Sequence, residues 1–249
     1  MSDVASLVSE AIAAHGGRER WQASREFVLD VSAGGLAVAS KFQSRGLRDL
    51  QAQIATDDQR VVFSPYPRSG CRGVYERGAV RIESDDGRVV GERADAGRHL
   101  RSARHILWWD RLDLLYFGAS ALWTYLAVPF IFAEPNVQVE AGEPWSEADQ
   151  VWRTLNVTFP AEIHTHSRRQ VFYIGEDGLV RRHDYTAEEF GKWAKSAHYW
   201  NELHDFDGLV IPKKRRVFPR RANNRPRGRP VLIWVDTSDL RSSATTAAG

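Results

Sequence analysis

The chain has 249 residues, and its 43% apolar and 11% aromatic content is typical of a folded globular protein and excludes a disordered chain. Its formal net charge is +2, and its single cysteine, Cys71, excludes an intramolecular disulfide. We expect one domain over residues 1–240 and a disordered tail over residues 241–249. The N-terminus carries Asp3 and Glu10 and has no basic start, so it predicts an amphipathic helix rather than a secretory signal, and the expected location is the cytoplasm.

The first half of the chain begins with a helix and continues with short strands. Apolar residues recur at helical spacing from Val4 to Ile12, and His15-Gly16-Gly17 supplies a helix stop. Turn signals such as Asp57-Asp58 then separate strand-like segments, a pattern that favours an antiparallel meander. The expected strands are Glu26 to Ala33, Leu36 to Gln43, Leu50 to Thr56, Arg60 to Ser64, Gly73 to Glu76 and Ala79 to Ser84.

An uncharged stretch from Leu114 to Ala133 is long enough to raise the question of a membrane span. We expect no transmembrane span, because Pro129 lies near its end and polar or small residues such as Gly118 and Ser120 dilute it. Apolar residues from Leu112 onward repeat at three and four residues, which predicts a buried helix. We expect this aromatic-rich helix to lie across the concave face of a curved sheet.

The second half of the chain returns to strand patterns. Asp207-Gly208 between two β-prone runs is a strong hairpin signal. The expected strands are Val137 to Glu140, Val151 to Phe159, Ile163 to Ile174, Leu179 to Tyr185, Ala194 to Phe206, Leu209 to Phe218 and Val231 to Asp236. The expected fold class is therefore α+β, with one large antiparallel sheet.

The hairpin around Gly175-Glu176-Asp177-Gly178 carries a dense set of polar side chains. If Ile174 lies opposite Leu179, alternate residues of both strands project from one face of the sheet. A slip of one residue would scatter them to both faces. The residues expected on that one face are His164, His166, Arg168, Gln170, Phe172, Arg181, His183 and Tyr185.

This face predicts a site for an acidic or polar head group, because guanidinium groups suit oxyanions and imidazole and phenol groups are further donors. The alternative is a purely structural role, in which Arg181 and Arg182 keep one face of the sheet solvated and pair with Asp184 or Glu188. The ligand-binding residues would be His164, His166, Arg168, Gln170, Phe172 and Arg181, with Trp123 and Phe130 at the apolar end.

An enzymatic alternative would use His183 and Tyr185 as an acid–base couple on the same molecule. The sequence has no GxSxG motif, dinucleotide-binding glycine motif or P-loop. We expect no cofactor. The alternative is a zinc or iron ion bound by His164, His166 and His183, which the nearby arginines would repel.

A basic segment from Lys213 to Arg229 contains no acidic residue. It is compatible with nucleic acid or with an anionic membrane surface. Strand alternation would split Lys213-Lys214-Arg215-Arg216 between two faces, and the rest of the chain is net acidic. We therefore do not expect nucleic acid as a partner.

The order of an N-terminal helix, a long antiparallel meander and an aromatic-rich helix resembles the half-barrel of the LolA-type lipoprotein carriers. The segments HGGRERW, WTYLAVPF, FPAEIHTHSRRQVFYIGEDGLVRRHDY and FDGLVIPKKRRVFPR also resemble a bacterial family of soluble LolA-like proteins of unassigned activity, over about residues 14–220. The resemblance implies a half-barrel fold. It also implies binding of a lipophilic molecule. Together with the polar face of the hairpin, this predicts a soluble protein that binds a lipophilic small molecule with an acidic or polar head group.

Overall fold

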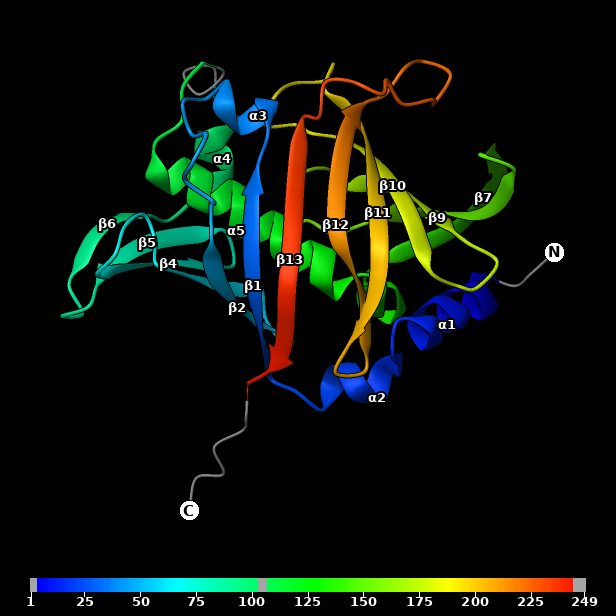
Figure 1. The fold of residues 1–249 in the computed structure, drawn as a ribbon, viewed down its shortest axis with the longest axis horizontal. Coiled ribbons are helices and arrows are strands. Elements are labelled where there is room, and N and C mark those ends of the chain that lie inside the picture. The colour runs from blue at the N-terminus through cyan, green and yellow to red at the C-terminus, as the bar shows by residue number, and fades with distance from the viewer. Residues whose placement is uncertain (1–3, 103–106, 244–249) are drawn as a thin grey trace.

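A computed structural model describes residues 4–102 and 107–243 of the chain (Figure 1). The strands in these ranges form one 13-stranded sheet in the order β6-β5-β4-β3-β2-β1-β13-β12-β11-β10-β9-β8-β7. Every pair of neighbouring strands is antiparallel. The expected α+β class with a large curved sheet, open rather than closed into a barrel, is confirmed.

Most strands begin and end close to the positions that the alternation of apolar residues predicts. The strands are β1 Glu26–Gly34, β2 Leu50–Ala55, β3 Arg60–Ser64, β4 Cys71–Glu76, β5 Ala79–Ser84, β6 Val89–Arg93, β7 Gln138–Glu147, β8 Gln150–Thr158, β9 Arg169–Ile174, β10 Val180–Thr186, β11 Lys195–Phe206, β12 Leu209–Pro219 and β13 Ile233–Ser242. Strand β6 was not expected, and β7, β9 and β13 each differ from the expected bounds by several residues at one end. The last strand includes the first two residues of the expected tail, and residues 244–249 of that tail lie outside the described residues.

The helices lie at the ends and on the concave face of the sheet (Figure 1). They are α1 Val4–Ala14, α2 Gly17–Gln22, α3 Leu36–Ala39, α4 Ala96–Leu100 and α5 Arg111–Ala127, with the 3-10 helix η2 Phe130–Ala133. None of the helices in residues 4–102 and 107–243 has the length and apolar character needed to cross a membrane.

One expected strand is wrong. The segment Leu36 to Gln43 forms α3 and a turn, because Gly35 has φ 129° and leaves the extended conformation directly after β1. The amides of Leu36 and Ala37 still donate hydrogen bonds to the β12–β13 connection, at Val231 and Leu232. Helix α3 therefore lies over one end of the sheet instead of extending it (Figure 1).

The expected helix over the concave face is confirmed as α5. A capping box starts it, because the Asp110 carboxylate accepts from the Asp113 amide and the Asp113 carboxylate accepts from the Asp110 amide. Arg93 on β6 binds both carboxylates at 2.7 and 2.6 Å. The helix is buried on nearly all sides, so it fills the hollow of the half-barrel, and many of its side chains belong to the core.

Helices α1 and α2 close the opposite end of the half-barrel from α3 (Figure 1). His15 joins them to two strands: its Nδ1 lies 2.6 Å from the carbonyl oxygen of Val210, and its Nε2 accepts from the amide of Val180. Gly16, at φ 113°, packs directly against the β11–β12 turn at Gly208. At the end with α3, a cleft opens into the interior.

Candidate functional site

The concave face carries a buried group of six polar side chains between α5 and strands β10–β12. We call it the inner polar cluster, and it comprises Tyr125, His166, His183, Tyr185, His198 and Arg215. Its rings are in contact: His183 lies 4.3 Å from His198 and 5.2 Å from Tyr185, and Tyr125 lies 4.7 Å from His198, between ring centroids.

The strand register that builds this cluster differs from the expected one. Phe172 lies opposite His183 instead of Arg181, because a β-bulge between Val180 and Arg182 adds one residue to β10 and the turn adds another. A shift of two residues keeps each side chain on its face. His183 and Tyr185 therefore still point inward with Gln170 and Phe172, while Arg181 does not.

The neighbouring strand pairs add two residues from far along the chain. His183 lies opposite His198 on β11, and Arg215 on β12 lies opposite Trp200. Trp200 Nε1 donates to His183 Nδ1 at 2.9 Å. Burial lowers the pKa of both His183 and His198 well below the usual value, and the nearby Arg215 acts in the same direction. Both rings are thus neutral at physiological pH.

Arg215 is the buried cation of this cluster. Its Nη2 donates to the carbonyl oxygen of Tyr125 at 2.8 Å, and its guanidinium carbon lies 4.0 Å from the ring centroid of Trp200. Within the described residues it forms no ion pair, its Nη1 has no hydrogen-bond partner, and both ring nitrogens of His198 also lack one. Burial lowers the pKa of Arg215 to about 9, so the group remains charged at neutral pH.

His166 and Tyr185 form the part of the cluster that faces the accessible end. His166 Nδ1 lies 2.9 Å from Glu189 Oε1, and its ring stacks on Tyr185 at 5.4 Å between centroids. The Tyr185 hydroxyl lies 3.4 Å from that of Tyr125. A carboxylate-bound imidazole beside a phenol can donate to, or exchange a proton with, a polar group placed against it.

A cleft of about 500 Å³ opens at the end of the half-barrel that carries α3. His166 and Tyr185 line its inner part, and apolar side chains such as Phe190 and Val217 line its walls. Lys195 and Arg227, both exposed, lie among its lining residues. The cleft therefore combines apolar walls, cations and polar groups of the inner polar cluster.

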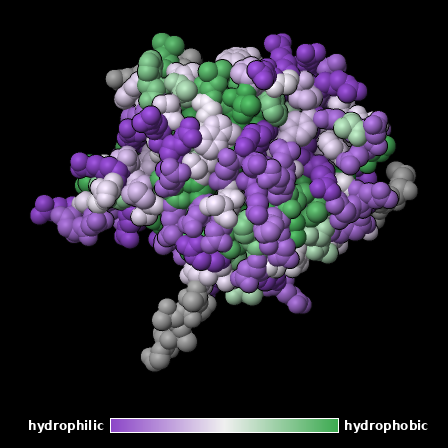
Figure 2. Space-filling model, viewed as in Figure 1, coloured by the Kyte–Doolittle hydropathy of each residue, from purple (hydrophilic) through white to green (hydrophobic). Residues whose placement is uncertain are grey.

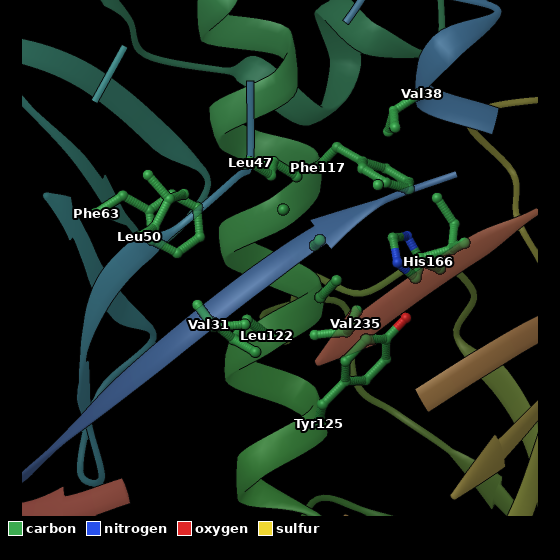
Figure 3. Close-up of a pocket in the computed structure, with 15 residues that line it drawn as sticks. Val31, Val38, Leu47, Leu50, Phe63, Phe117, Leu122, Tyr125, His166 and Val235 are labelled. Atoms are coloured by element: carbon green, nitrogen blue, oxygen red, sulfur yellow. The ribbon is translucent and has the colours of Figure 1, made fainter. Parts of the chain in front are cut away.

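Behind the cleft lies a separate apolar cavity of about 40 Å³ between α5 and strands β1–β3 (Figure 3). Phe117, His166 and Ile233 line both hollows, so these three side chains separate them. Figure 3 shows His166 and Tyr125 on one side of the cavity and Leu50 and Phe63 on the other. A cavity of this size holds about one water molecule.

Three of the expected ligand-binding residues do not join the cluster. His164 lies on the loop before β9 rather than on a strand, and its ring packs edge-on against Tyr116 at 6.2 Å. Arg168 is exposed and its Nε donates to the carbonyl oxygen of Phe159, and Arg181 pairs with Asp177 in the hairpin turn. The expected common face of His164, His166, Arg168 and Arg181 is therefore wrong, because strand β9 begins only at Arg169 and Arg181 occupies the bulge.

The other expected ligand-binding residues have structural contacts. Gln170 donates to Thr165 Oγ1 and to the carbonyl oxygen of Ser167, which orders the loop that carries His166. Phe172 stacks on His183 at 5.2 Å. Trp123 and Phe130 lie elsewhere: Trp123 donates to the carbonyl oxygen of Ala55, and Phe130 stacks on Trp21 at 4.8 Å. Their predicted roles in binding stay predictions.

His183-Asp184 cannot act as a pair, as the strand alternation predicts. Asp184 points to the convex face, where it binds the buried Arg182 at 2.7 Å. Over residues 4–102 and 107–243, no group of three or more His, Cys, Asp or Glu side chains is arranged to hold a metal ion. His164 lies apart from His166 and His183, so these three histidines do not form the zinc or iron site that the sequence raised as an alternative.

The most informative residues that sequence reasoning missed are Arg215 and Tyr125. One signal pointed to Arg215: it shares strand parity with Ile211 and Val217, so alternation places it on the apolar face. Its place within a run of four basic residues hid that signal. No comparable signal marked Tyr125, which is one of many aromatic residues on α5.

Comparisons with known proteins identify the fold. No family model matches the sequence, and no curated protein matches it. Among solved structures, a DUF1329 family protein from Desulfovibrio piger superposes with a TM-score of 0.54 at 13% identity, covering 98% of this chain and 95% of that one. A LolA superfamily protein from Nitrosomonas europaea gives 0.53 at 8% identity, covering 96% and 93%.

A third similar structure corrects the expected location. It is provisionally described as an outer membrane lipoprotein-sorting protein domain from Vibrio parahaemolyticus, and it superposes with a TM-score of 0.54 at 8% identity, covering 96% of this chain and 92% of that one. The expected LolA-like fold is confirmed by these structures. The expected cytoplasmic location is wrong, because the similar structure from Vibrio parahaemolyticus is described as a domain of a protein that sorts lipoproteins of the outer membrane.

Proposed function

We propose that this protein binds an amphipathic lipophilic molecule with an anionic head group, such as a carboxylate. The apolar part lies in the cleft between α3 and the β10–β11 loop, and the head group faces the inner polar cluster. His166 and Tyr185 donate hydrogen bonds to it, and Arg215 supplies the positive charge. A LolA-like half-barrel that is open at one end is a suitable scaffold for this arrangement, although the fold by itself assigns no ligand.

The observation that carries this proposal is the buried charge of Arg215. A guanidinium in the interior loses its hydration and is costly unless an anion or several hydrogen bonds compensate it. Among the described residues no carboxylate binds it, and one of its terminal nitrogens has no acceptor. An anionic ligand would provide the missing compensation, so the protein favours an anionic over a neutral head group.

The dimensions of the two hollows support a ligand with a short or medium apolar part. The cleft of about 500 Å³ falls within the range of small-molecule pockets. The cavity of about 40 Å³ is too small for an acyl chain as it stands. A longer chain can enter it only if Phe117 or His166 moves, because these side chains form the shared wall.

The test replaces Arg215 with methionine, which keeps most of the volume and removes the charge. Displacement of the neutral probe N-phenyl-1-naphthylamine would report the binding of lauric acid and of dodecanol. We expect the affinity of Arg215→Met for lauric acid to fall by about 10- to 100-fold, with the affinity for dodecanol unchanged. We expect stability to urea to be unchanged or higher, because the substitution removes an uncompensated buried charge.

Arg216→Met is the matched control. Arg216 is adjacent on β12 but points to the opposite face, where it donates to Asp236 at 2.6 Å. It should bind both probes like the wild type. Equal binding of lauric acid by the wild type and Arg215→Met, or a wild type that binds neither amphiphile, would contradict the proposed function.

A further inference from the structure

Large apolar side chains are exposed around the open end of the half-barrel. Leu36, Phe42, Leu107, Trp108 and Trp193 account for five of the eight large hydrophobic residues that are exposed in the described part of the chain. Phe42 and Leu107 are each 76% exposed, and Trp193 is 80% exposed. Figure 2 shows hydrophobic surface at the top of the molecule, where Figure 1 has α3. Such a concentration is unusual on a surface that faces only water.

Three separate segments carry these residues, and buried contacts hold the segments together. The Trp109 ring lies 5.1 Å from that of Phe190, and Lys41 Nζ lies 5.6 and 5.1 Å from the two ring centroids. Gln43 Nε2 also donates to the carbonyl oxygen of Trp109 at 2.6 Å. The turn after α3, the segment before α5 and the β10–β11 loop therefore present their exposed apolar residues on one rim.

An arginine-rich loop completes this rim. The β12–β13 loop contains five arginines and no acidic residue, and Arg221, Arg225, Arg227 and Arg229 are exposed. The loop is held in place, because the buried Arg182 donates to the carbonyl oxygen of Asn224 and Arg220 donates to the Asn224 side chain at 2.7 Å. Leu36, Trp193 and Arg227 all line the cleft, so the loop lies beside the apolar residues.

We propose that this rim docks on a membrane surface that contains anionic lipid. We define the docking rim as Leu36, Phe42, Leu107, Trp108 and Trp193 together with Arg221, Arg225, Arg227 and Arg229. Tryptophan, phenylalanine and leucine on protruding turns can enter the interfacial region of a bilayer, where aromatic rings are favoured. Arginines beside them are attracted to anionic head groups. The positive charge of the loop is thus complementary to a membrane that contains anionic lipid.

The position of the cleft gives this docking a consequence. The cleft opens between the elements that carry the docking rim, so an amphipathic molecule can pass between bilayer and cleft without crossing bulk water. Docking itself depends on the rim and not on the inner polar cluster. The two proposals can therefore fail independently.

The test measures binding of the full chain to vesicles by co-flotation. We expect binding to vesicles of phosphatidylcholine mixed with phosphatidylglycerol, weaker binding to pure phosphatidylcholine, and a decrease with added salt. The double substitution Phe42→Asn and Leu107→Gln should reduce binding to mixed vesicles roughly tenfold. Neither residue lines the cleft, and asparagine tolerates the positive φ of Phe42, so folding and ligand binding should be retained.

A second variant tests the charge. Arg225→Gln, Arg227→Gln and Arg229→Gln together should remove the preference for anionic vesicles and most of the salt dependence. The matched controls are Val151→Ser and Arg88→Gln, which change an exposed apolar and an exposed basic residue away from the rim, and both should bind like the wild type. Arg215→Met should also dock normally, which separates this proposal from the proposed function.

Two results would overturn membrane docking. One is a Phe42→Asn/Leu107→Gln variant that binds mixed vesicles as well as the wild type. The other is a wild-type protein that binds neither kind of vesicle but self-associates in sedimentation experiments, with this self-association lost in the Phe42→Asn/Leu107→Gln variant. That second result would assign the rim to a protein–protein contact.

Discussion

At the scale of single residues, the interior of this protein is unusual because it holds polar groups that are not fully hydrogen-bonded. His198 has no hydrogen-bond partner for either ring nitrogen within the described residues, and Arg215 lacks one for Nη1. Most buried polar groups in proteins are paired, because an unpaired one has lost its hydration without replacement. The unpaired groups of the cluster therefore lower the stability of the folded protein.

Three buried histidines make stability dependent on pH. Burial lowers the pKa of His15 to about 4 and the pKa values of His183 and His198 well below the usual value. Below an unfolded pKa of about 6.5, each ring takes up a proton on unfolding but not in the folded state. Acid therefore favours unfolding, and stability should rise from about pH 5 to about pH 7 and then level off.

Urea unfolding at several pH values checks this expectation. The free energy of unfolding should fall by about 2 kcal/mol for each such histidine between about pH 7 and pH 5. His198→Phe should reduce the loss by about that amount. A wild-type stability that is flat over this pH range would show that the three histidines are not held neutral.

At the scale of elements, the closed end of the half-barrel depends on a close approach of backbone to backbone. Both Gly16 and Gly17 follow α1 and have positive φ angles, of 113° and 85°. A Cβ atom on Gly16 would lie 2.0 Å from the carbonyl oxygen of Gly208, whereas one on Gly17 would meet nothing within 4 Å. Substitutions at the two positions therefore distinguish the energetic cost of a positive φ angle from the cost of a steric clash.

Alanine at these two positions should have different effects. Gly17→Ala should lower the free energy of unfolding by about 1 kcal/mol through the positive φ alone. Gly16→Ala should lower it by about 3 kcal/mol or more, because α1 must move away from the β11–β12 turn and the bonds of His15 are strained. Chemical unfolding of the two variants gives the comparison, and equal losses would contradict the close approach.

At the scale of the whole molecule, the cleft and the apolar cavity lie on either side of the wall made by Phe117, His166 and Ile233. The cavity behind that wall is apolar and small, so it would limit how far the proposed ligand extends. Ala121 on α5 lines it, whereas Ala119 on the same helix is fully buried and does not. These two alanines allow a matched experiment.

Valine at position 121 should fill the cavity, and valine at position 119 should overpack the core. Ala121→Val should gain about 1 kcal/mol of stability, after its lower helix propensity is subtracted. Ala119→Val should lose about 1–3 kcal/mol. If long chains reach the cavity, Ala121→Val should weaken binding of long fatty acids more than that of short ones. An unchanged chain-length preference would place the whole ligand in the cleft.

Much of the fold could be predicted because its signals are local. Apolar alternation placed β3 at Arg60–Ser64 and β5 at Ala79–Ser84, and three- and four-residue spacing identified α5. The strand expected after Gly35 was wrong because a single glycine with φ 129° redirects the chain. Local patterns cannot show such a change of direction when β-prone residues follow it.

The candidate site was predictable only in part, because its geometry depends on pairings between distant segments. Sequence reasoning placed His183, Tyr185 and Phe172 on one face, and a shift of two residues in register left that face unchanged. It also assigned His164, Arg168 and Arg181 to the site, which the loop before β9 and the bulge at Arg181 keep apart from it.

The amino-acid sequence by itself determined the class of this protein: an antiparallel half-barrel with a buried aromatic helix, since periodicity and turn residues act over a few positions. Only the tertiary structure decided which polar groups meet inside it. Tyr125, His166, His183, His198 and Arg215 come from five different segments, and they converge because strand pairing and the packing of α5 set distances that no local pattern encodes.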